Sequence, residues 1–467
     1  MKQNGIESNL LELIESFLSN RSQRVVLNGI ESEWASVYSG VPQGSVLGPL
    51  LFLIYINDLT DNIKSSIKLF ADDSSLFIKV RNLDEAHSLL SSDLATITSW
   101  AHQWKMQFNP DITKQAIEII FSNKHIKQNH PPLIFGEIPV ARKDSTKHLG
   151  FHLDEKLDFK LHVSESIKKA NKGVAILKLL SKYLSRNKLE LAYKLHVRCH
   201  LEYGDVIFHD RSSDISKTLE SIQYQAALAV SGCWNKTSRE KLYAELGWES
   251  LADRRKFHRL TLYYKIKNNI APNYLNEHVL QTPPAGSNRY KNSFFPFCFS
   301  NWECLDPLIK NSVSVSSFKS NYLKTIRPPR KKSYNIRDRR GLSLLTRMRV
   351  EHSDLREHRY HHNFNCSSPI CNCSTSEIES PEHFLLRCPR FASQRIILFS
   401  NLVTAVNSEF LNLPHDHLSK ILLFGSNAFN DITNKIILET TIHFIKCSKR
   451  FKKLEAYAVT PVISNPT

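Results

Sequence analysis

Two adjacent carboxylates, Asp72 and Asp73, are the residues whose types and spacing point most directly to chemistry. The apolar segments on either side, residues 67–70 and 76–80, predict short strands buried on both faces. Adjacent carboxylates at the tip of a buried hairpin repel each other, and a divalent cation compensates that repulsion. Carboxylates suit a hard ion such as Mg²⁺, and two ions about 3.5–4 Å apart can activate a 3′-hydroxyl and stabilise leaving pyrophosphate. The alternative is an ordinary Asp-rich turn in water.

A glycine-rich loop precedes this pair. Gly40, Gly44 and Gly48 are three of the fourteen glycines of the chain and fall within nine residues. Glycine lets a backbone approach a ligand closely, and free N–H groups beside a helix start favour phosphate. Pro49 is suited to the first position of an apolar helix predicted to reach about Leu59. Taken alone, the loop also fits a structural turn, but glycine loop, helix and paired Asp together are far more specific.

A second site candidate is a cysteine cluster near the C-terminus. Four of the nine cysteines fall within residues 366–388, which indicates a metal site in a reducing compartment and not a disulfide framework. Three thiolates and one imidazole form a tetrahedral zinc set, and we assign it to Cys371, Cys373, His383 and Cys388. Cys366 is then a spare or an alternative ligand. Free thiols remain the alternative to zinc.

Charge and composition limit the class of protein. Lys and Arg number 62 against 45 Asp and Glu, and this net charge of +17 favours a polyanionic partner. Twelve Lys or Arg fall within residues 321–360, where a solvated basic loop is the alternative to a binding segment. A hydrophobic content of 41% excludes a wholly disordered chain. The longest apolar-rich run, residues 46–56, is too short to span a membrane, and residues 1–7 contain no signal core. We expect an intracellular protein, nuclear or cytoplasmic, that is not secreted.

The surrounding sequence predicts mixed structure followed by helices. Asn28-Gly29 predicts a tight hairpin turn within residues 23–38, and residues 134–140 and 148–154 predict further short strands. Apolar residues at spacings of three and four predict helices at 10–18, 83–104, 163–184, 187–200, 215–231, 238–245, 251–267, 417–423 and 430–451.

The two N-terminal motifs resemble those of a known family. Residues 40–52, Gly-Val-Pro-Gln-Gly-Ser-Val-Leu-Gly-Pro-Leu-Leu-Phe, followed by Phe-Ala-Asp-Asp at 70–73, are similar to the reverse transcriptase of non-LTR, LINE-like (jockey-type) retrotransposons. The resemblance covers most of the chain. Residues 100–109 with Lys114 resemble the next family motif, residues 147–154 its primer grip, and residues 201–205 and 238–248 the helical region behind its thumb.

The resemblance implies roles for single residues. Asp72 and Asp73 would be two of three carboxylates that bind Mg²⁺, and Lys114 would be the lysine of its motif. Contacts to the incoming nucleotide and the template–primer would come from Gly40, Gln43 and Gly44, and the floor beside the primer end from Phe70 and Ala71. The implied reaction is RNA-templated addition of a deoxynucleotide to a primer 3′-OH supplied by nicked target DNA. The implied partners are an RNA template, a DNA primer and deoxynucleotides. The Cys/His element resembles the family's C-terminal module, which would hold a structural zinc.

One element of the family pattern is missing from this sequence. The third carboxylate of the family lies in an upstream box of the type Phe-x-Asp-hydrophobic-x-Lys-Ala-Phe-Asp, and no such box is present. Asp58, Asp61 and Asp84 are poor substitutes because they are predicted at helix ends away from the hairpin tip. We therefore expect the chain to start downstream of that box and to be inactive as a free-standing polymerase.

The predicted architecture is α+β: a partial right-hand polymerase palm with a helical thumb and connection and a small C-terminal zinc-binding element. The predicted divisions are partial fingers and palm at 1–125, primer grip and thumb at 126–212, helical connection at 213–281, basic linker at 282–360, Cys/His element at 361–400 and C-terminal helices at 401–467. Two other hypotheses remain open. One is a basic, zinc-containing nucleic-acid-binding module without catalysis, and the other is an active enzyme that receives its missing strand from another chain.

Overall fold

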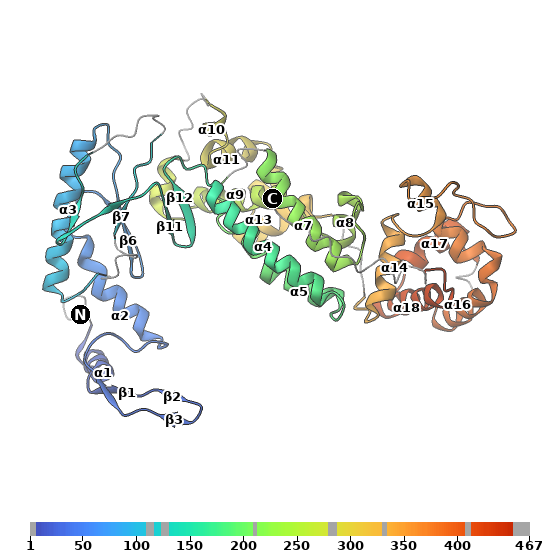
Figure 1. The fold of residues 1–467 in the computed structure, drawn as a ribbon, viewed down its shortest axis with the longest axis horizontal. Coiled ribbons are helices and arrows are strands. Elements are labelled where there is room, and N and C mark those ends of the chain that lie inside the picture. The colour runs from blue at the N-terminus through green and yellow to red at the C-terminus, as the bar shows by residue number, and fades with distance from the viewer. Residues whose placement is uncertain are drawn as a thin grey trace. The chain divides into compact units, whose positions relative to one another are not determined.

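The computed structural model describes residues 6–108, 116–122, 130–208, 213–278, 287–328, 334–406 and 412–451. The chain divides into two compact units, Met1–His148 with Leu153–Leu157 and Leu149–His152 with Asp158–Thr467 (Figure 1). Short strands are concentrated in the first unit and helices in the second. This mixture agrees with the predicted α+β class.

The first unit begins with a helix and two antiparallel strand pairs. Asn28 and Gly29 adopt φ of 51° and 82°, the left-handed conformation that a two-residue hairpin turn requires, as the sequence predicts. These first elements are α1 (Ser8–Leu18), β1 (Arg21–Gln23) paired with β4 (Ala35–Val37), and β2 (Val26–Leu27) paired with β3 (Ile30–Glu31).

The hairpin with the two carboxylates packs against helices on one face only. Strands β5 (Ser66–Phe70) and β6 (Asp73–Phe77) pair in antiparallel register, and Leu69 and Leu76 contact the core of α2 (Leu47–Ile56) and α3 (Leu83–Gln103). On the other face Phe70 and Phe77 are 64% and 50% exposed. The prediction of strands buried on both faces is therefore wrong for the described residues, because this sheet has two strands and a single covered face.

Helix α3 is fixed to the start of this hairpin by a buried carboxylate. Asn82 caps the helix, and the Asp93 side chain accepts hydrogen bonds from the backbone amides of Lys64 (3.0 Å) and Ser65 (2.7 Å). The remaining strands are short pairs: β7 (Ile117–Glu118) with β10 (Ala141–Arg142), β8 (Ile134–Phe135) with β9 (Ile138–Pro139), and β11 (Ser145–His148) with β12 (Phe151–Asp154). The single strand predicted over residues 148–154 is thus interrupted by a turn.

The second unit is helical. The helix predicted over residues 187–200 contains a π-helical segment, Lys194–Arg198, where α4 approaches so closely that a methyl group on Gly173 would lie 2.2 Å from the His196 carbonyl oxygen. Its first helices are α4 (Lys160–Leu180), α5 (Arg186–Tyr193), α6 (Cys199–Glu202), α7 (Ser213–Ser231), α8 (Arg239–Leu246) and α9 (Leu251–Lys267).

Residues 282–360, predicted as a basic linker, contain packed helices. The aromatic residues of this segment bury against α9, with Trp302 and Phe318 stacked at a ring-centroid distance of 5.8 Å and in contact with Tyr264. These aromatic side chains are buried, so this part of the segment packs as helices against α9. The helices are α10 (Asn288–Lys291), α11 (Phe294–Glu303), α12 (Pro307–Lys310), α13 (Val315–Ile326) and α14 (Arg339–Arg349).

The C-terminal helices share one hydrophobic core with the cysteine cluster. Cys371 and Cys388 lie in the same cluster of buried residues as Leu345, Leu398 and Ile437. The helices are α15 (Arg356–His361), α16 (Ala392–Ala405), α17 (His415–Phe424) and α18 (Asp431–Cys447). Among the described residues, no helix has the length and apolarity needed to cross a bilayer.

Candidate functional site

The structure places the two candidate carboxylates at the turn of the β5–β6 hairpin. Phe70 pairs with Asp73, so Ala71 and Asp72 form the turn, and Ala71 adopts a left-handed φ of 49°. Both carboxylates are exposed to solvent. Within the described ranges no third His, Cys or acidic side chain forms a metal-like group with them. The structure therefore presents two hard oxygen ligands beside each other but does not complete a set of three.

Asp58, one of the poor substitutes considered for the third ligand, is occupied elsewhere. Its carboxylate accepts a hydrogen bond of 2.8 Å from the indole N–H of Trp100. This contact links the short helix Asn57–Thr60 to α3. Asp58 thus has a structural partner of its own.

The glycine-rich loop lies between β4 and α2 and exposes part of its backbone. Gly40 and Gly44 adopt φ of 75° and 83°, so a side chain at either position would be strained, and Gln43 between them is exposed. Gly48 differs, because a methyl group there would lie 2.9 Å from the Ser45 hydroxyl, which accepts the Gly48 amide at 3.0 Å. Gly48 therefore serves the start of the helix, while Gly40 and Gly44 leave backbone accessible to a ligand.

Of two other residues that the resemblance singled out, Phe70 and Lys114, the structure describes only the first. Phe70 is 64% exposed on the open face of the hairpin, on the same face as Asp73. Lys114 lies outside the described residues.

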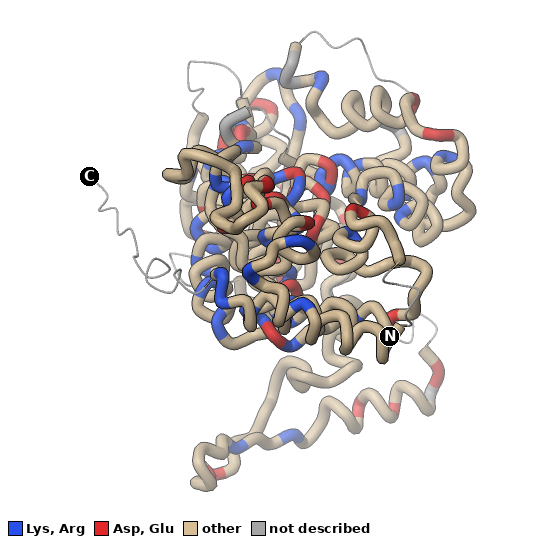
Figure 2. The backbone as a smooth tube through the Cα atoms, turned by 90° about the vertical axis from the view of Figure 1, so that its right-hand side faces the viewer, with Lys and Arg blue, Asp and Glu red and all other residues tan. Residues whose placement is uncertain are grey.

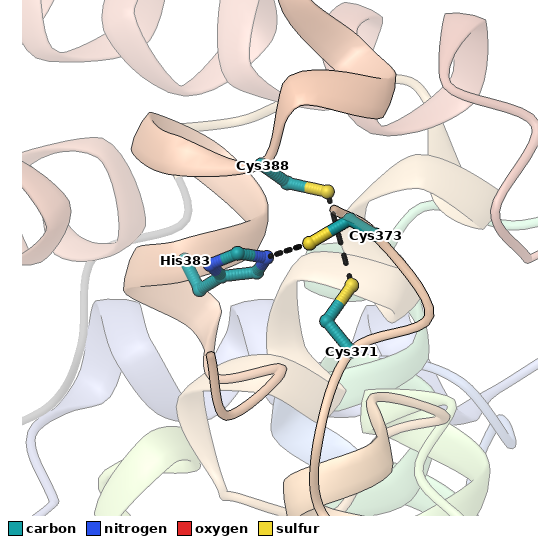
Figure 3. A group of neighbouring side chains, drawn as sticks. All are labelled: Cys371, Cys373, His383 and Cys388. Carbon is teal, nitrogen blue, oxygen red and sulfur yellow. Dashed lines mark hydrogen bonds between the residues drawn. The ribbon is translucent and has the colours of Figure 1, made fainter. Parts of the chain in front are cut away.

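The four predicted zinc ligands converge on one point (Figure 3). Their ligand atoms all lie within 4.8 Å of one another. The Sγ atoms of Cys371 and Cys388 are 3.8 Å apart, and Cys373 Sγ lies 3.4 Å from His383 Nε2. Zn–S bonds near 2.3 Å and Zn–N bonds near 2.0 Å in a tetrahedron require separations of about 3.8 Å and 3.5 Å. The donor set and its spacing therefore fit zinc.

Local backbone structure brings these ligands together. Cys371 and Cys373 lie in a loop whose ends meet in an antiparallel bridge between Ile370 and Ile378, and the Cys371 amide donates to the Glu377 carbonyl at 2.7 Å. His383 starts a π-helical segment, His383–Arg387, and Cys388 follows that segment directly.

Side chains around the ligands define their roles. Glu377 Oε2 lies 3.2 Å from His383 Nδ1, which directs Nε2 of the same ring toward the three sulfur atoms. Cys366 is not part of the group, and its thiol donates instead to the Ser368 carbonyl at 3.2 Å. The structure thus separates the four ligands from the cysteine whose role the sequence left open. Glu377 was missed at the sequence level, although its place between Cys373 and His383 was a usable signal.

The thiols differ in how easily they lose a proton. Burial raises the pKa of Cys371 to about 12 and also raises that of Cys388. At Cys373 the neighbouring Thr375 hydroxyl, 3.1 Å away, lowers the thiol pKa to about 6. The buried thiols of Cys371 and Cys388 are therefore costly to ionise unless a cation joins them.

The basic segment is partly used inside the protein. Lys and Arg are spread along the chain and interspersed with Asp and Glu (Figure 2). Arg339 donates to the Ala229 carbonyl (2.7 Å) and Arg347 to the Gly232 carbonyl (2.9 Å), at the C-terminal end of α7. Burial lowers the pKa of Arg339 to about 10. These side chains complete a helix end, so they are not available to a nucleic acid.

Two further cations of the basic segment pair with carboxylates. Arg327 pairs with Glu249 at 2.5 Å, and Arg349 is fully buried against Glu245 at 3.0 Å. Residues 329–333 of the segment lie outside the described residues. The sequence indicated the excess of positive charge but not its burial.

Comparison with known proteins finds similarity to reverse transcriptases. Residues 2–153, which contain the glycine loop and both carboxylates, match the family described as Reverse transcriptase (RNA-dependent DNA polymerase). The chain is a relative of the LINE-like reverse transcriptases. The match to this nucleotidyltransferase family covers the same region that holds the predicted motifs.

Three proteins similar to this chain come from Drosophila melanogaster. The probable RNA-directed DNA polymerase from transposon X-element is 30% identical over 230 residues, 47% of this chain and 25% of the relative. The RNA-directed DNA polymerase from mobile element jockey is 26% identical over 278 residues, 56% of this chain and 29% of the relative. The probable RNA-directed DNA polymerase from transposon BS is 25% identical over 232 residues, with shares of 47% and 25%. The chain thus spans between a quarter and a third of the length of these curated relatives.

Proposed function

We propose that this reverse transcriptase chain takes part in RNA-templated addition of deoxynucleotides to a primer 3′-OH. The observation that supports the proposal is the order of parts in the matched region: an exposed glycine loop, the apolar helix α2, and a hairpin that presents Asp72 and Asp73 side by side. The RNA template, the DNA primer or target and the deoxynucleotides are the partners that such a reaction requires.

In this proposal Asp72 and Asp73 hold Mg²⁺. Both are exposed carboxylates on a tight turn, which is the donor chemistry that Mg²⁺ prefers. Bound metal would activate the 3′-hydroxyl and stabilise charge on the leaving pyrophosphate. The chain's own groups would orient the substrates: Gly40, Gln43 and Gly44 the nucleotide and template, and Phe70 with Ala71 the primer end.

Helix α4 offers a surface for the nucleic-acid backbone. Its exposed residues include lysines and large apolar side chains, with Glu165 the acidic residue among its described positions. Lysine contacts to phosphate combined with apolar contacts to the sugars and bases are typical of nucleic-acid-binding surfaces. The residues are Lys168, Lys169, Lys172, Lys178, Ile176 and Leu179.

The cysteine cluster completes the proposal as a structural zinc site. Cys371, Cys373, His383 and Cys388 would occupy all four positions of a tetrahedral ion, so no position remains open for catalysis. The cluster lies in the core of the C-terminal helices, which makes a role in stability the natural one.

Primer extension tests the catalytic part. Because two carboxylates position two metal ions poorly, we expect no extension of a DNA primer on an RNA template by this chain alone. Extension that disappears in Asp72→Ala/Asp73→Ala would contradict the expected inactivity, and would show that a third ligand exists that the sequence pattern does not reveal.

Nucleotide-dependent binding tests the polymerase assignment without requiring turnover. In the presence of Mg²⁺, the next correct deoxynucleotide should tighten binding to a 3′-dideoxy-terminated primer–template, and an incorrect one should not. The effect should vanish in Asp72→Ala/Asp73→Ala and persist in the control Asp84→Ala. Salt-dependent binding with no nucleotide discrimination would reject the polymerase assignment in favour of a binding module without catalysis.

A further inference from the structure

The turn between β11 and β12 has an unusual backbone. Its two residues, Leu149 and Gly150, adopt φ of 47° and 80°, and both are exposed. A left-handed conformation is ordinary for glycine but unfavourable for a bulky residue such as leucine. Such strained positions persist only where surrounding contacts hold them, and they concentrate at functional sites.

Tyr203 supplies the contact that holds this turn. Its hydroxyl donates a hydrogen bond to the Leu149 carbonyl across 54 positions of sequence. The ring also lies against Gly150, where an added methyl group would be 3.1 Å from the Tyr203 hydroxyl oxygen. The tyrosine thus contacts both residues of the turn and fixes the carbonyl that the left-handed leucine presents.

The backbone of Tyr203 and Gly204 is itself held by His162 and by Phe151 of β12. The Tyr203 carbonyl lies 2.9 Å from His162 Nε2, and the His162 ring stacks on Phe151 at 3.8 Å. Gly204 adopts φ of 75° and packs so closely that a methyl group there would lie 2.4 Å from the Phe151 ring. Phe151 follows the turn directly in sequence and is 6% exposed.

The residues that flank Tyr203 and Gly204 in the sequence attach this pair to α9. Glu202 forms an ion pair with Arg254 through two side-chain hydrogen bonds, and Asp205 lies 2.6 Å from His258 Nδ1. The glutamate and the aspartate are both largely buried, so these contacts exchange little with water. Tyr203 is therefore held on a rigid support.

We infer that Tyr203 is a positioning residue for the Leu149–Gly150 turn, through which it would act on the primer binding that the proposed function requires. The inference rests on the proposed function, since residues 147–154 are the segment that resembles a primer grip. Its basis in this chain is an exposed turn with a left-handed leucine, to which the half-exposed Tyr203 donates a hydrogen bond. No motif of the sequence pairs residue 203 with residue 149.

Two measurements on the full-length chain test this inference. The first is the affinity for a fluorescein-labelled DNA primer on an RNA template, measured by anisotropy at fixed salt for wild type, Tyr203→Phe and the control Tyr183→Phe, an exposed tyrosine beyond α4. Because Tyr203→Phe loses one net hydrogen bond, we expect this variant to bind the primer–template about five-fold more weakly than wild type. The control should bind as wild type does. The second is amide hydrogen exchange of residues 149–152, which should accelerate in Tyr203→Phe but not in Tyr183→Phe.

A compensating substitution separates positioning from general destabilisation. Asparagine tolerates the left-handed conformation, so Leu149→Asn should relieve the turn of its dependence on Tyr203. The loss of affinity caused by Tyr203→Phe should then be smaller in the Leu149→Asn background, because residues in contact do not act additively.

Each contrary result has a distinct meaning. Faster exchange with unchanged affinity would overturn the role in primer binding, and unchanged exchange would overturn the positioning role itself. A full five-fold loss in the Leu149→Asn background would overturn the link between the two residues. A wild-type chain that binds no primer–template would reject the proposed function and the role in primer binding together, while the exchange measurement would still decide whether Tyr203 holds the turn.

Discussion

Individual side chains at the cysteine cluster have separable roles. The sequence offered five candidate ligands there, Cys366 included, and the structure groups four of them. Glu377 adds a carboxylate partner for His383, the arrangement that fixes the orientation of metal-binding histidines in other proteins. Substitutions can therefore distinguish the four candidate ligands from Glu377, which contacts His383, and from Cys366, which lies outside the group.

Replacing a ligand should release the metal and destabilise the C-terminal helices. We expect wild type to bind one zinc ion per chain and Cys371→Ser to bind it far more weakly, because one of four ligand positions is lost. Zinc content by atomic emission and thermal unfolding with and without chelator are the measurements. Cys366→Ser is the matched control and should keep both the zinc and the melting temperature. Equal zinc loss in the two variants would contradict the assigned ligand set.

At the scale of single elements, the hairpin with the two carboxylates depends on α3. Asp93 accepts the amides of Lys64 and Ser65, the residues at which the chain enters β5. Burial alone would raise the pKa of Asp93, but the hydrogen bonds from Lys64 and Ser65 outweigh it and lower that pKa. The ionised carboxylate therefore stabilises the folded state.

Asp93→Asn should lower the free energy of unfolding of the first unit by about 1–2 kcal/mol at neutral pH, since charged hydrogen bonds become neutral ones. A carboxyl whose pKa is lower in the folded state than in the unfolded state stabilises the folded state at pH values above its unfolded-state pKa of about 3.9. That stabilisation is lost as the pH falls through the pKa of the folded state. The two proteins should thus converge in stability below about pH 4. Denaturant melts across pH test this, with the exposed neighbour Ser92→Asn as control. A pH-independent difference would contradict the role of the charge.

The close contact between α4 and the π-helical segment Lys194–Arg198 gives a second prediction at this scale. A methyl group at Gly173 would meet the His196 carbonyl oxygen at 2.2 Å, and backbone cannot move aside as a flexible side chain can. Gly173→Ala should therefore destabilise the protein by about 2 kcal/mol despite the better helix propensity of alanine. Asn171→Ala, at an exposed position of the same helix, should be neutral or stabilising in the same thermal melt. A stabilised Gly173→Ala protein would show that the helices do not approach this closely.

At the scale of the whole molecule, buried arginines join helices that are distant in sequence. Glu245 of α8 lies 2.8 Å from Arg186 of α5 and 3.0 Å from Arg349 of α14, and both arginines are fully buried. Two cations depend on this one carboxylate, with Glu190 a weaker partner of Arg186 at 3.4 Å.

Glu245→Gln should destabilise the second unit by about 3–5 kcal/mol, because it leaves buried positive charge without compensation. Chemical denaturation followed by far-ultraviolet circular dichroism measures the change. Glu351→Gln is a suitable control, since the Lys241–Glu351 pair on the surface should contribute less than about 1 kcal/mol. Comparable losses in the two variants would show that burial does not determine the value of these ion pairs.

The sequence by itself determined the features that depend on near neighbours. Asn28-Gly29 specifies its turn because few residues tolerate the left-handed conformation. The four candidate zinc ligands could be grouped from the sequence because they lie within eighteen residues of one another. The resemblance to reverse transcriptases was evident from residues 40–52 and 70–73, whose chemistry is local. The helical periodicities predicted at residues 163–267 and 417–451 were read correctly for the same reason, whereas the helices between these two stretches were not predicted.

Tertiary structure alone decided which groups are buried. A count of charges cannot show that Arg339 caps α7 or that Arg349 meets Glu245, because the partners lie more than one hundred positions away. The same holds for the single covered face of the β5–β6 hairpin, for the helices that pack against α9, and for the hydrogen bond from Tyr203 to Leu149. Burial depends on which surfaces meet, and that is a property of the folded chain.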